Sequence, residues 1–504
     1  MQTIERVRGM LDAPPEGAEH LGALSAALLG HFAGYGYRPV QVPLVEFAEL
    51  FLRKSGADVS ARLYSFTDQG GRRLALRPEL TAPVLRAFLQ QANQPPLPAR
   101  LSYSGPVFRY EKPQRGRYRQ FTQAGVELIG AEPPYADAEL LKMTAEAPAL
   151  LGLRETRMVI GHLGIVLAFL SALEIDGRTE AILLQGLETL KKGQEGAHVL
   201  RRLLGLETDG ADPLLTTAPT LPGDPQVQAI LAGMPRPDAI LLVRSLLGSI
   251  NTDVGGGREP EEIVDRLLER LRAGDQRGKA ERAIAFILDL SRLAGPRPVA
   301  LQQAEDLIRR YRLPVEPLLE LERVCQALDS MDFDWSNVTI DLSLGRGLQY
   351  YTGLVFEVYG TGLGSEDQLC GGGRYDGLAA ALGSKQPLPA LGCSWGLERL
   401  RLLTEPLASD HWLDALVVPS ETTFGYANTV AHALRARGMR VELELRQRNL
   451  RASIAYAARQ GARWLLVAGE RELATETVTA RRLGAGQEQA LALATLRAEG
   501  LPQP

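Results

Sequence analysis

The chain has 504 residues, of which 45% are apolar and 23% are charged, and its formal net charge is −4. This length is typical of about two to four domains, and the composition is ordinary for a globular protein. The charge balance excludes a globally basic surface, so any contact with nucleic acid has to use local patches.

The cysteines and the N-terminal segment bear on the location of the protein. Cys325, Cys370 and Cys393 are too widely spaced for a zinc pattern or a disulfide framework, which predicts a reducing, cytoplasmic setting. The N-terminal segment lacks the apolar core of a signal peptide. No uninterrupted run of about 18 apolar residues occurs, so we expect no membrane span and no membrane partner.

Residues 1–152 mix helices and strands. Helical spacing over residues 18–37 places Leu24 and Leu28 on one face, and glycines follow as a stop signal. Prolines then interrupt a strand, including Pro43, as expected of an edge or interface segment. A hairpin ending in LRPEL and two long strands around the loop KPQRGR complete this part.

The rest of the chain divides into three parts by residue composition and periodicity. Periodic leucine, alanine and arginine predict a mainly helical insertion at residues 153–335. Strand signals return at residues 336–408, and we predict an α+β fold in which these strands join those of residues 1–152 in one antiparallel sheet with flanking helices. Alternating strands and helices predict a small α/β domain at residues 413–504.

Charged residues follow the first hairpin. Arg77 and Glu79 lie two apart in LRPELTAP and are expected to share a face. A carboxylate on the concave face of a sheet binds a substrate ammonium group through charge-assisted hydrogen bonds. A surface ion pair between these two residues is the simpler alternative.

The loop between the two long strands is rich in charge. It is surrounded by Arg109, Glu111, Arg117 and Arg119. Because the forked guanidinium matches phosphate oxygens, this loop predicts a polyphosphate site, with solvated surface arginines as the alternative. Beyond the loop, Gln123 and Glu127 are four apart on a strand and add an amide and a carboxylate to one face.

Two glycine-bearing segments carry further arginines and tyrosines. Arg346 precedes Tyr350 and Tyr351, and three glycines precede Arg374 and Tyr375. An arginine in a cleft stabilises negative charge that develops at phosphorus or at a carboxylate, and a tyrosine wall holds a flat side chain. Glycines let a ligand approach the backbone closely, although a plain tight turn also explains them.

One more arginine, Arg399, lies at the start of a helix in GLERL, where it either grips a nucleotide phosphate or lies on the helix surface. The sequence has no G-x-x-x-x-G-K-[ST] loop, and no G-x-G-x-x-G follows a strand. A nucleotide would therefore bind by other means.

Together these motifs resemble the class II aminoacyl-tRNA synthetases, and among them the histidyl-tRNA synthetase family. GYGYRPVQVP is similar to the dimer-forming first class motif, FRYE with RQFTQAGVE to the second, and GLERL to the third. RGLQYYTGLVFE and GGGRYDGL resemble the two histidine-specific segments. The motifs follow the family's order over residues 1–150 and 336–404, and residues 413–504 resemble its anticodon-binding domain.

The resemblance implies a reaction in which histidine and ATP give histidyl-adenylate and pyrophosphate before transfer to tRNA(His). It implies Mg²⁺ on the phosphates, no prosthetic group and a homodimer. It assigns catalysis to Arg109 and Arg346 through positioning and charge stabilisation. ATP binding falls to Arg109, Glu111, Arg117 and Arg399. Histidine binding falls to Glu79, Thr81, Gln123, Glu127, Tyr350, Tyr351 and Tyr375.

A paralogue of that family offers an alternative, the regulatory subunit of ATP phosphoribosyltransferase, which senses histidine and does not aminoacylate. Leu80 and Gln349 stand where the synthetases usually have glycine and aspartate, and IGHLGIVLAFL resembles the paralogue. Its partner would be the short-form ATP phosphoribosyltransferase catalytic subunit. A histidine sensor or tRNA-binding protein without catalysis is a third possibility.

Other features favour the synthetase. The paralogue typically lacks Arg346, Arg399 and the C-terminal domain. Residues 413–504 carry twelve arginines and no lysine against nine carboxylates, a local excess of three positive charges that suits RNA phosphates. The insertion either leans over the tRNA acceptor stem or docks another protein, and His162 at its edge is expected to be structural.

Overall fold

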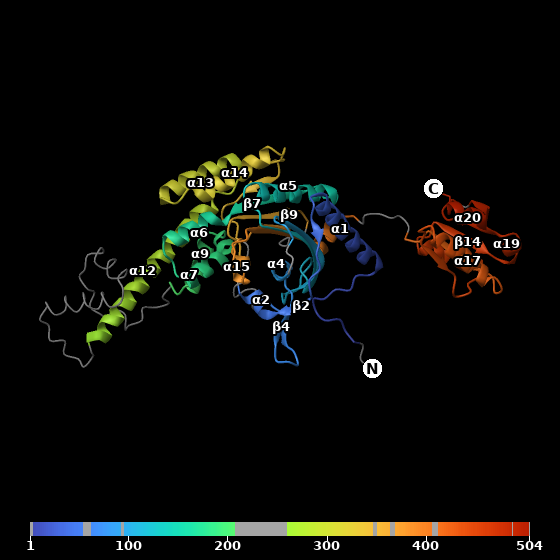
Figure 1. Ribbon diagram of the computed structural model, residues 1–504, viewed down its shortest axis with the longest axis horizontal. Coiled ribbons are helices and arrows are strands. Elements are labelled where there is room, and N and C mark those ends of the chain that lie inside the picture. The colour runs from blue at the N-terminus through green and yellow to red at the C-terminus, as the bar shows by residue number, and fades with distance from the viewer. Residues whose placement is uncertain are drawn as a thin grey trace. The chain divides into compact units, whose positions relative to one another are not determined.

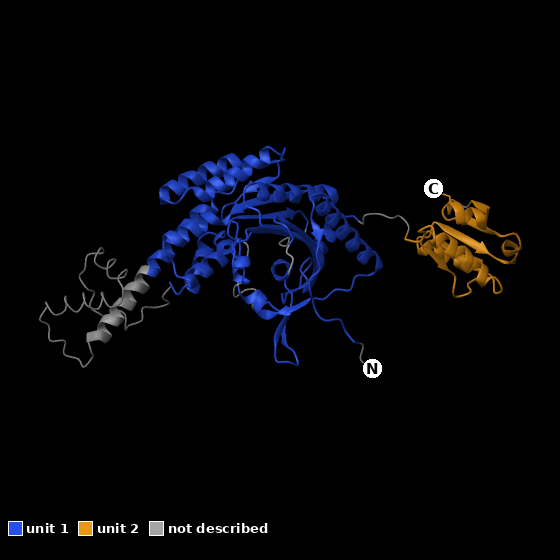
Figure 2. Ribbon diagram, viewed as in Figure 1, with its two compact units in different colours: residues 1–406 blue, residues 407–504 orange. Residues whose placement is uncertain are grey.

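The computed structural model describes most of the chain (Figure 1). The described ranges are 4–53, 62–91, 95–206, 260–345, 350–362, 368–405, 412–485 and 487–502, and the side chains of 260–275 are left aside. The chain forms two compact units, Met1–Pro406 and Leu407–Pro504 (Figure 2).

The first unit is built on a main sheet in the order β1-β5-β6-β11-β10-β9-β7-β8. Neighbouring strands from β5 to β7 are antiparallel, whereas β1 and β8 pair in parallel at the edges. This confirms the predicted α+β fold, in which strands from both ends of the first unit join one mainly antiparallel sheet. The strands are β1 Arg38–Pro39, β5 Ala99–Phe108, β6 Gln120–Ile129, β7 Thr156–His162, β8 Val338–Ile340, β9 Leu354–Gly360, β10 Gln368–Arg374 and β11 Ala390–Gly396.

Helices cover one face of the main sheet. Leu24, Leu28 and Phe32 of the first helix are fully buried, as its spacing predicts, in a core with Ala124 and Val126 of β6. Figure 1 shows α5 and α14 along the sheet, and α5 packs on β11. Three helices of this part are α1 Pro15–Gly34, α5 Tyr135–Leu150 and α16 Leu397–Leu403.

A small antiparallel sheet has the strand order β2-β4-β3. Its strands lie between β1 and β5 in the sequence. The interrupted strand and the hairpin predicted from the sequence are both present. The elements are β2 Val45–Phe47, α2 Ala48–Leu52, β3 Ser65–Thr67, β4 Arg73–Leu76, α4 Thr81–Gln90 and, later in the chain, α15 Leu378–Ala381.

The range 153–335 begins with β7, which belongs to the main sheet between β9 and β8. Its helical part therefore begins at α6, and we refer to α6–α14 as the helical segment. Phe169, Phe286 and Tyr311 pack together in it, with the two phenylalanine ring centroids 4.0 Å apart. Its described helices are α6 Leu163–Ala172, α7 Gly177–Gln185, α8 Leu187–Leu190, α9 Gln194–Leu203, α12 Pro260–Ser291, α13 Arg297–Tyr311 and α14 Glu316–Asp329.

The second unit has a five-stranded sheet in the order β13-β12-β14-β15-β16. Its first three strands are parallel and the last two antiparallel, so the predicted α/β alternation is followed by a hairpin. The elements are β12 Ala415–Pro419, α17 Phe424–Arg435, β13 Val441–Leu443, α18 Leu450–Arg459, β14 Trp464–Ala468, α19 Glu470–Ala474, β15 Thr477–Arg482, β16 Glu488–Ala492 and α20 Leu493–Glu499. None of the helices in the described ranges of either unit combines the length and apolarity needed to cross a membrane.

Candidate active site

The candidate site lies on the face of the main sheet opposite α1 and α5, which we call the site face. Alternate residues of a strand point to the same side, so Gln123 and Glu127 of β6 share this face. In the neighbouring strand β11, Gly396 pairs with Gln123 and Gly392 pairs with Glu127. These glycines leave room in front of the sheet.

Glu127 is the most buried carboxyl group of the site, with no exposed surface. It accepts hydrogen bonds from Thr81 Oγ1 at 2.7 Å, from Tyr103 OH at 2.9 Å and from Tyr375 OH. A Cβ atom at Gly392 would lie 1.9 Å from Glu127 Oε2, so this approach requires glycine.

The environment of Glu127 favours its protonated form. Burial raises the pKa of Glu127 to about 8, and the nearby Glu79 carboxylate adds to the rise. The hydroxyl groups of Tyr375, Thr81 and Tyr103 act in the opposite direction but do not offset the burial. A cation placed beside this carboxyl would therefore be strongly favoured, because it would allow the group to ionise.

Glu79 supports the start of α4. Its Oε2 accepts a hydrogen bond from the Thr81 amide at 2.6 Å and its Oε1 from the Ala82 amide at 3.1 Å. Burial raises the pKa of Glu79 too. Glu79 and Glu127 thus form a pair of buried carboxyls at the N-terminus of α4. Thr81 links them, since its amide donates to Glu79 and its hydroxyl to Glu127.

The predicted neighbour of Glu79 behaves differently. Arg77 Nη1 donates to Val42 O at 2.7 Å, and its Nε donates to Pro106 O at 2.9 Å. Both Arg77 and Glu79 are buried, at 4% and 6% exposure, so the alternative of a surface ion pair is wrong. Arg77 points away from Glu79 because β4 ends at Leu76, and the strand alternation used to predict a shared face does not extend that far.

Gln123 presents an unused acceptor. Its Nε2 donates to Ser394 Oγ at 3.0 Å, and its Oε1 is buried without a hydrogen-bond partner. The residue is 8% exposed and lines the cleft described below. Since a buried acceptor without a partner is unfavourable, Oε1 is suited to a donor of a bound ligand.

The tyrosines form one wall. The ring of Tyr350 lies 4.8 Å from Tyr351 and 5.6 Å from Tyr375, measured between centroids. A Cβ atom at Gly373 would lie 2.8 Å from the Tyr351 ring, so the glycine makes room for this wall. Arg346 and Gln349 lie outside the described residues.

We call the surroundings of the buried carboxyls Glu79 and Glu127 the acidic pocket. An arginine-lined cleft lies beside it, since Arg109 of the cleft donates to Pro78 O, directly before Glu79. About 650 Å³ of space in the cleft is not filled by protein atoms, and part of this space is open solvent. The charged and amide side chains of the cleft are Arg109, Glu111, Arg117, Gln123, Gln368, Glu398 and Arg399. Most of the predicted phosphate-binding residues therefore meet in one place.

Glu111 organises two of the arginines. It pairs with Arg117 and, at 3.0 Å, with Arg62. Burial alone would raise the pKa of Glu111, but Arg117, Arg109 and Arg62 outweigh it and lower the pKa. Glu111 is therefore ionised at neutral pH and neutralises part of the positive charge of the cleft.

The remaining arginines are fixed by backbone oxygens. Arg109 Nε donates to Pro78 O at 2.9 Å, and Arg399 donates to Gly116 O at 2.9 Å and Gln368 O at 2.6 Å. Arg399 thus lines the cleft instead of the helix surface. Arg119 does not line it, because its guanidinium binds Glu111 O and stacks on Tyr110.

Sequence reasoning missed Tyr103, Ser394 and Glu398. Tyr103 lies on β5 opposite Gly125, and Glu398 accepts from the Thr122 amide at 2.8 and 2.9 Å and from Thr122 Oγ1 at 3.0 Å. Only the pairing register brings these residues to the site, and no local pattern reports it. The one available signal was the position of Glu398 directly before Arg399.

Comparison with solved structures places the fold. The histidyl-tRNA synthetase from Nostoc superimposes with a TM-score of 0.65 at 20% identity, over 99% of both chains. A Bacillus halodurans protein described as an ATP phosphoribosyltransferase regulatory subunit/histidyl-tRNA synthetase gives 0.62 at 23% identity, over 93% of this chain and 99% of that one. The fold is that of the class II aminoacyl-tRNA synthetases.

Sequence comparisons identify the family. The model of the histidyl-tRNA synthetase family matches residues 9–250 and 231–400, and a model of the anticodon binding domain matches residues 414–499. The histidine–tRNA ligase of Methanocaldococcus jannaschii is 29% identical over 97% of this chain and 98% of its own length. That of Pyrococcus abyssi is 31% identical over 96% of both. The chain belongs to the histidyl-tRNA synthetase family, as the motifs indicate.

Proposed function

We propose that this protein is a histidine–tRNA ligase. It would activate histidine with ATP to histidyl-adenylate and pyrophosphate, and then transfer the histidyl group to the 3′ end of tRNA(His). Family membership over nearly the whole chain, including an anticodon-binding domain, supports the reaction. The observation that carries the proposal is the acidic pocket of Glu79 and Glu127 beside the arginine-lined cleft.

The acidic pocket fits histidine. The described groups that contact Glu127 are hydroxyls, so a bound ammonium or imidazole N–H would supply the missing positive charge or donor. Gln123 Oε1 offers a further acceptor. The tyrosine wall of Tyr350, Tyr351 and Tyr375 would hold the flat ring.

The cleft fits ATP. In this proposal Arg109 binds the α-phosphate and the histidine carboxylate, Arg399 binds the γ-phosphate, and Glu111 with Arg117 orients the nucleotide. Arg346 would stabilise the charge that develops when the carboxylate attacks the α-phosphate. Catalysis then consists of positioning and electrostatic stabilisation, without a covalent enzyme intermediate.

Mg²⁺ would enter as part of the ATP complex. Of the carboxylates that line the cleft, Glu398 already accepts hydrogen bonds from Thr122, and Glu111 is paired with arginines. Mg²⁺ commonly binds through substrate phosphates, a few waters and one or two carboxylates. We therefore expect the ATP phosphates and water to provide most of the Mg²⁺ ligands, and the protein few.

A homodimer in the cytoplasm completes the proposal. One face of the small sheet exposes apolar side chains, Phe47 at 56% and Phe66 at 45%, which suits contact with a second copy. Residue alternation explains the patch, since Phe47 and Phe66 both pair with Leu74 and share its face. The three cysteines are buried and form no disulfide, in keeping with a reducing compartment.

Leu80, one departure from the synthetase pattern, packs into the hydrophobic core. Leu80 is 2% exposed and packs with Val84 and Tyr103. Its backbone angles, φ −109° and ψ −17°, are open to any residue, so glycine is not required there. Leu80 therefore gives little support to the regulatory-subunit alternative.

Histidine-dependent ATP–pyrophosphate exchange tests the proposal directly. We expect exchange with histidine, and tRNA charging when tRNA(His) is added. An Arg399→Gln variant should lose affinity for ATP while keeping the histidine KM. Absence of exchange, together with activation of a short-form ATP phosphoribosyltransferase, would establish the regulatory subunit instead, and histidine binding without either activity would point to a sensor.

A further inference from the structure

The helical segment contacts the core beside the proposed histidine pocket. Its contacts lie next to the described residues 341–345 and 352–353, which precede and follow Tyr350 and Tyr351 in the chain. One contact comes from the end of α8 and the other from α14. Both contacts are polar. The first joins Lys191 to Asp341, which are 150 positions apart, and the second joins His162 to Glu320, which are 158 positions apart.

The first contact centres on Lys191. Its Nζ lies 2.9 Å from Asp341 Oδ2 and 2.9 Å from Glu188 Oε1. Asp341 Oδ1 in turn accepts hydrogen bonds from the Ser343 amide at 3.0 Å and its hydroxyl at 2.7 Å. Glu188 Oε1 accepts from the Gly345 amide at 3.1 Å. Lys191 therefore ties α8 to both ends of the turn 341–345.

Charge and packing reinforce this contact. Burial alone would lower the pKa of Lys191, but Asp341 and Glu188 outweigh it and raise the pKa. The lysine therefore stays charged between its two carboxylates. A Cβ atom at Gly345 would lie 2.5 Å from Leu187 Cβ, so the chain passes directly against α8 just before Arg346.

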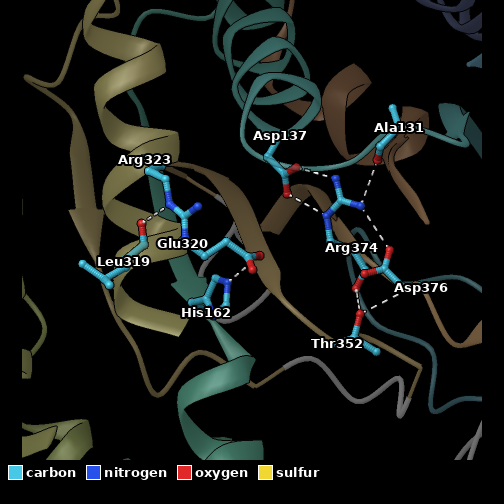
Figure 3. A network of polar contacts seen from close by, with 9 residues as sticks. All are labelled: Ala131, Asp137, His162, Leu319, Glu320, Arg323, Thr352, Arg374 and Asp376. Carbon is cyan, nitrogen blue, oxygen red and sulfur yellow. Dashed lines mark hydrogen bonds and ion pairs between the residues drawn. The ribbon is translucent and has the colours of Figure 1, made fainter. Parts of the chain in front are cut away.

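The second contact joins α14 to the end of β7, as Figure 3 shows. His162 Nε2 lies 3.2 Å from Glu320 Oε1, and the ring is 3% exposed. The histidine lowers the pKa of Glu320, so the carboxylate is ionised and Nε2 donates the hydrogen bond. A Cβ atom at Gly353 would lie 3.5 Å from Glu320 Oε1, which places this pair against the turn after the tyrosines.

That turn is connected to the histidine-facing side of β10. The Thr352 amide donates to Arg374 O at 2.8 Å, and the Asp376 amide donates to Thr352 Oγ1 at 3.2 Å (Figure 3). Tyr375, whose hydroxyl donates to Glu127, lies between the two partners of Thr352 in the chain. A shift at Thr352 or Gly353 would therefore move the tyrosine wall and the Glu127 contact together.

We propose that the helical segment positions the amino-acid pocket, and that Lys191 and Glu320 are its positioning residues. Neither touches Glu127. Lys191 binds Asp341, which precedes the tyrosines in the chain, whereas Glu320 acts through His162, whose neighbour Leu163 donates its amide to Gly353 O at 2.9 Å, after the tyrosines. The inference rests on the proposed function for its kinetic consequence, since Tyr350 and Tyr351 of the proposed histidine wall lie between these two contacts in the chain. It gives the helical segment a role in histidine binding in addition to any contact with tRNA.

Matched variants test the two contacts in the full-length chain. Lys191→Met is compared with Lys192→Met, its exposed neighbour, and Glu320→Gln with Glu322→Gln on the same helix. We expect Lys191→Met and Glu320→Gln to raise the histidine KM in ATP–pyrophosphate exchange by about tenfold, because small misplacements of a binding wall are costly. The ATP KM should not change, and Lys191→Arg should restore the histidine KM.

Hydrogen–deuterium exchange gives a readout that needs no enzymatic activity. In Lys191→Met, peptides covering 341–345 should exchange faster, and in Glu320→Gln those covering 352–353 should do so, with both controls unchanged. Unaltered exchange in these peptides would overturn the inference whatever reaction the wild type performs. A parallel fall of kcat and of kcat/KM for both histidine and ATP, together with a smaller folded fraction, would also overturn the inference. Such a result would indicate general destabilisation of the protein.

Discussion

Glu127 combines full burial with a ring of hydroxyl donors from Thr81, Tyr103 and Tyr375. The unfolded chain loses this proton near the ordinary glutamate pKa, whereas the folded protein retains it up to about pH 8. Between these values the native state binds more protons than the unfolded state. The contribution of Glu127 to the free energy of unfolding therefore falls as the pH rises through this window.

Replacing Glu127 by glutamine should remove that pH dependence. We expect Glu127→Gln to become more stable relative to the wild type as the pH rises from about 5 to about 8, and to lose histidine binding. Urea unfolding at both pH values measures the first effect, and calorimetric titration with histidine measures the second. Glu132→Gln, an exposed change, serves as the control. A stability difference that stays constant with pH would show that Glu127 is ionised in the folded protein.

At the scale of elements, Arg374 joins β10 to α5. It is 1% exposed, donates to both oxygens of the buried Asp137, and reaches Ala131 O and Asp376 Oδ1 at 3.1 Å each (Figure 3). Arg374 is the last residue of β10, and its guanidinium binds Asp137 of α5, whereas Tyr375, directly after the strand, donates its hydroxyl to Glu127. The arginine of GGGRYDGL is thus an anchor for the tyrosine beside it.

Removing this anchor should be severe. Arg374→Met leaves Asp137 buried without its cation, which we expect to cost about 3–5 kcal/mol in the unfolding of the first unit. The double variant Arg374→Met/Asp137→Asn removes both charges and should recover a large part of the loss. Urea denaturation of the single and double variants measures this. If the double variant is no more stable than Arg374→Met, the buried charge is not the cause.

For the whole molecule, we expect the proposed homodimer to form through the exposed apolar face of the small sheet. One face of the small sheet carries Phe47, Phe66 and Val45, of which Val45 is 40% exposed. Ala75 on the other face is buried against α2. A stable dimer needs roughly 1,600 Å² of buried surface, so this patch would form only the apolar centre of a larger interface.

The double variant Phe47→Ser/Phe66→Ser should therefore shift the protein toward monomer. Light scattering coupled to size-exclusion chromatography, over a range of protein concentrations, measures the change in mass. Val299→Ser, which alters an exposed apolar residue of α13, should leave the dimer intact. A wild-type monomer would refute the dimer itself, and an unchanged double variant would place the interface elsewhere.

The sequence alone predicted the fold class, which the structure confirms, and most residues of the candidate site. Periodicity located the helices of the insertion and the strands around the charged loop, because these patterns are local. Motif order located Glu79, Arg109, Gln123, Glu127, Tyr375 and Arg399, since each lies within a short recognisable segment. The buried face of α1, with Leu24 and Leu28, followed from helical spacing in the same way.

Only the tertiary structure decided how these residues act on one another. Tyr375 and Glu127 are 248 positions apart, and their hydrogen bond depends on the register of β10, β11 and β6. The same holds for Arg77, which binds backbone carbonyls instead of Glu79, and for Lys191 against Asp341. Local patterns specify which face a side chain takes within its own element. Contacts between distant elements depend on register and packing, which a single sequence does not display.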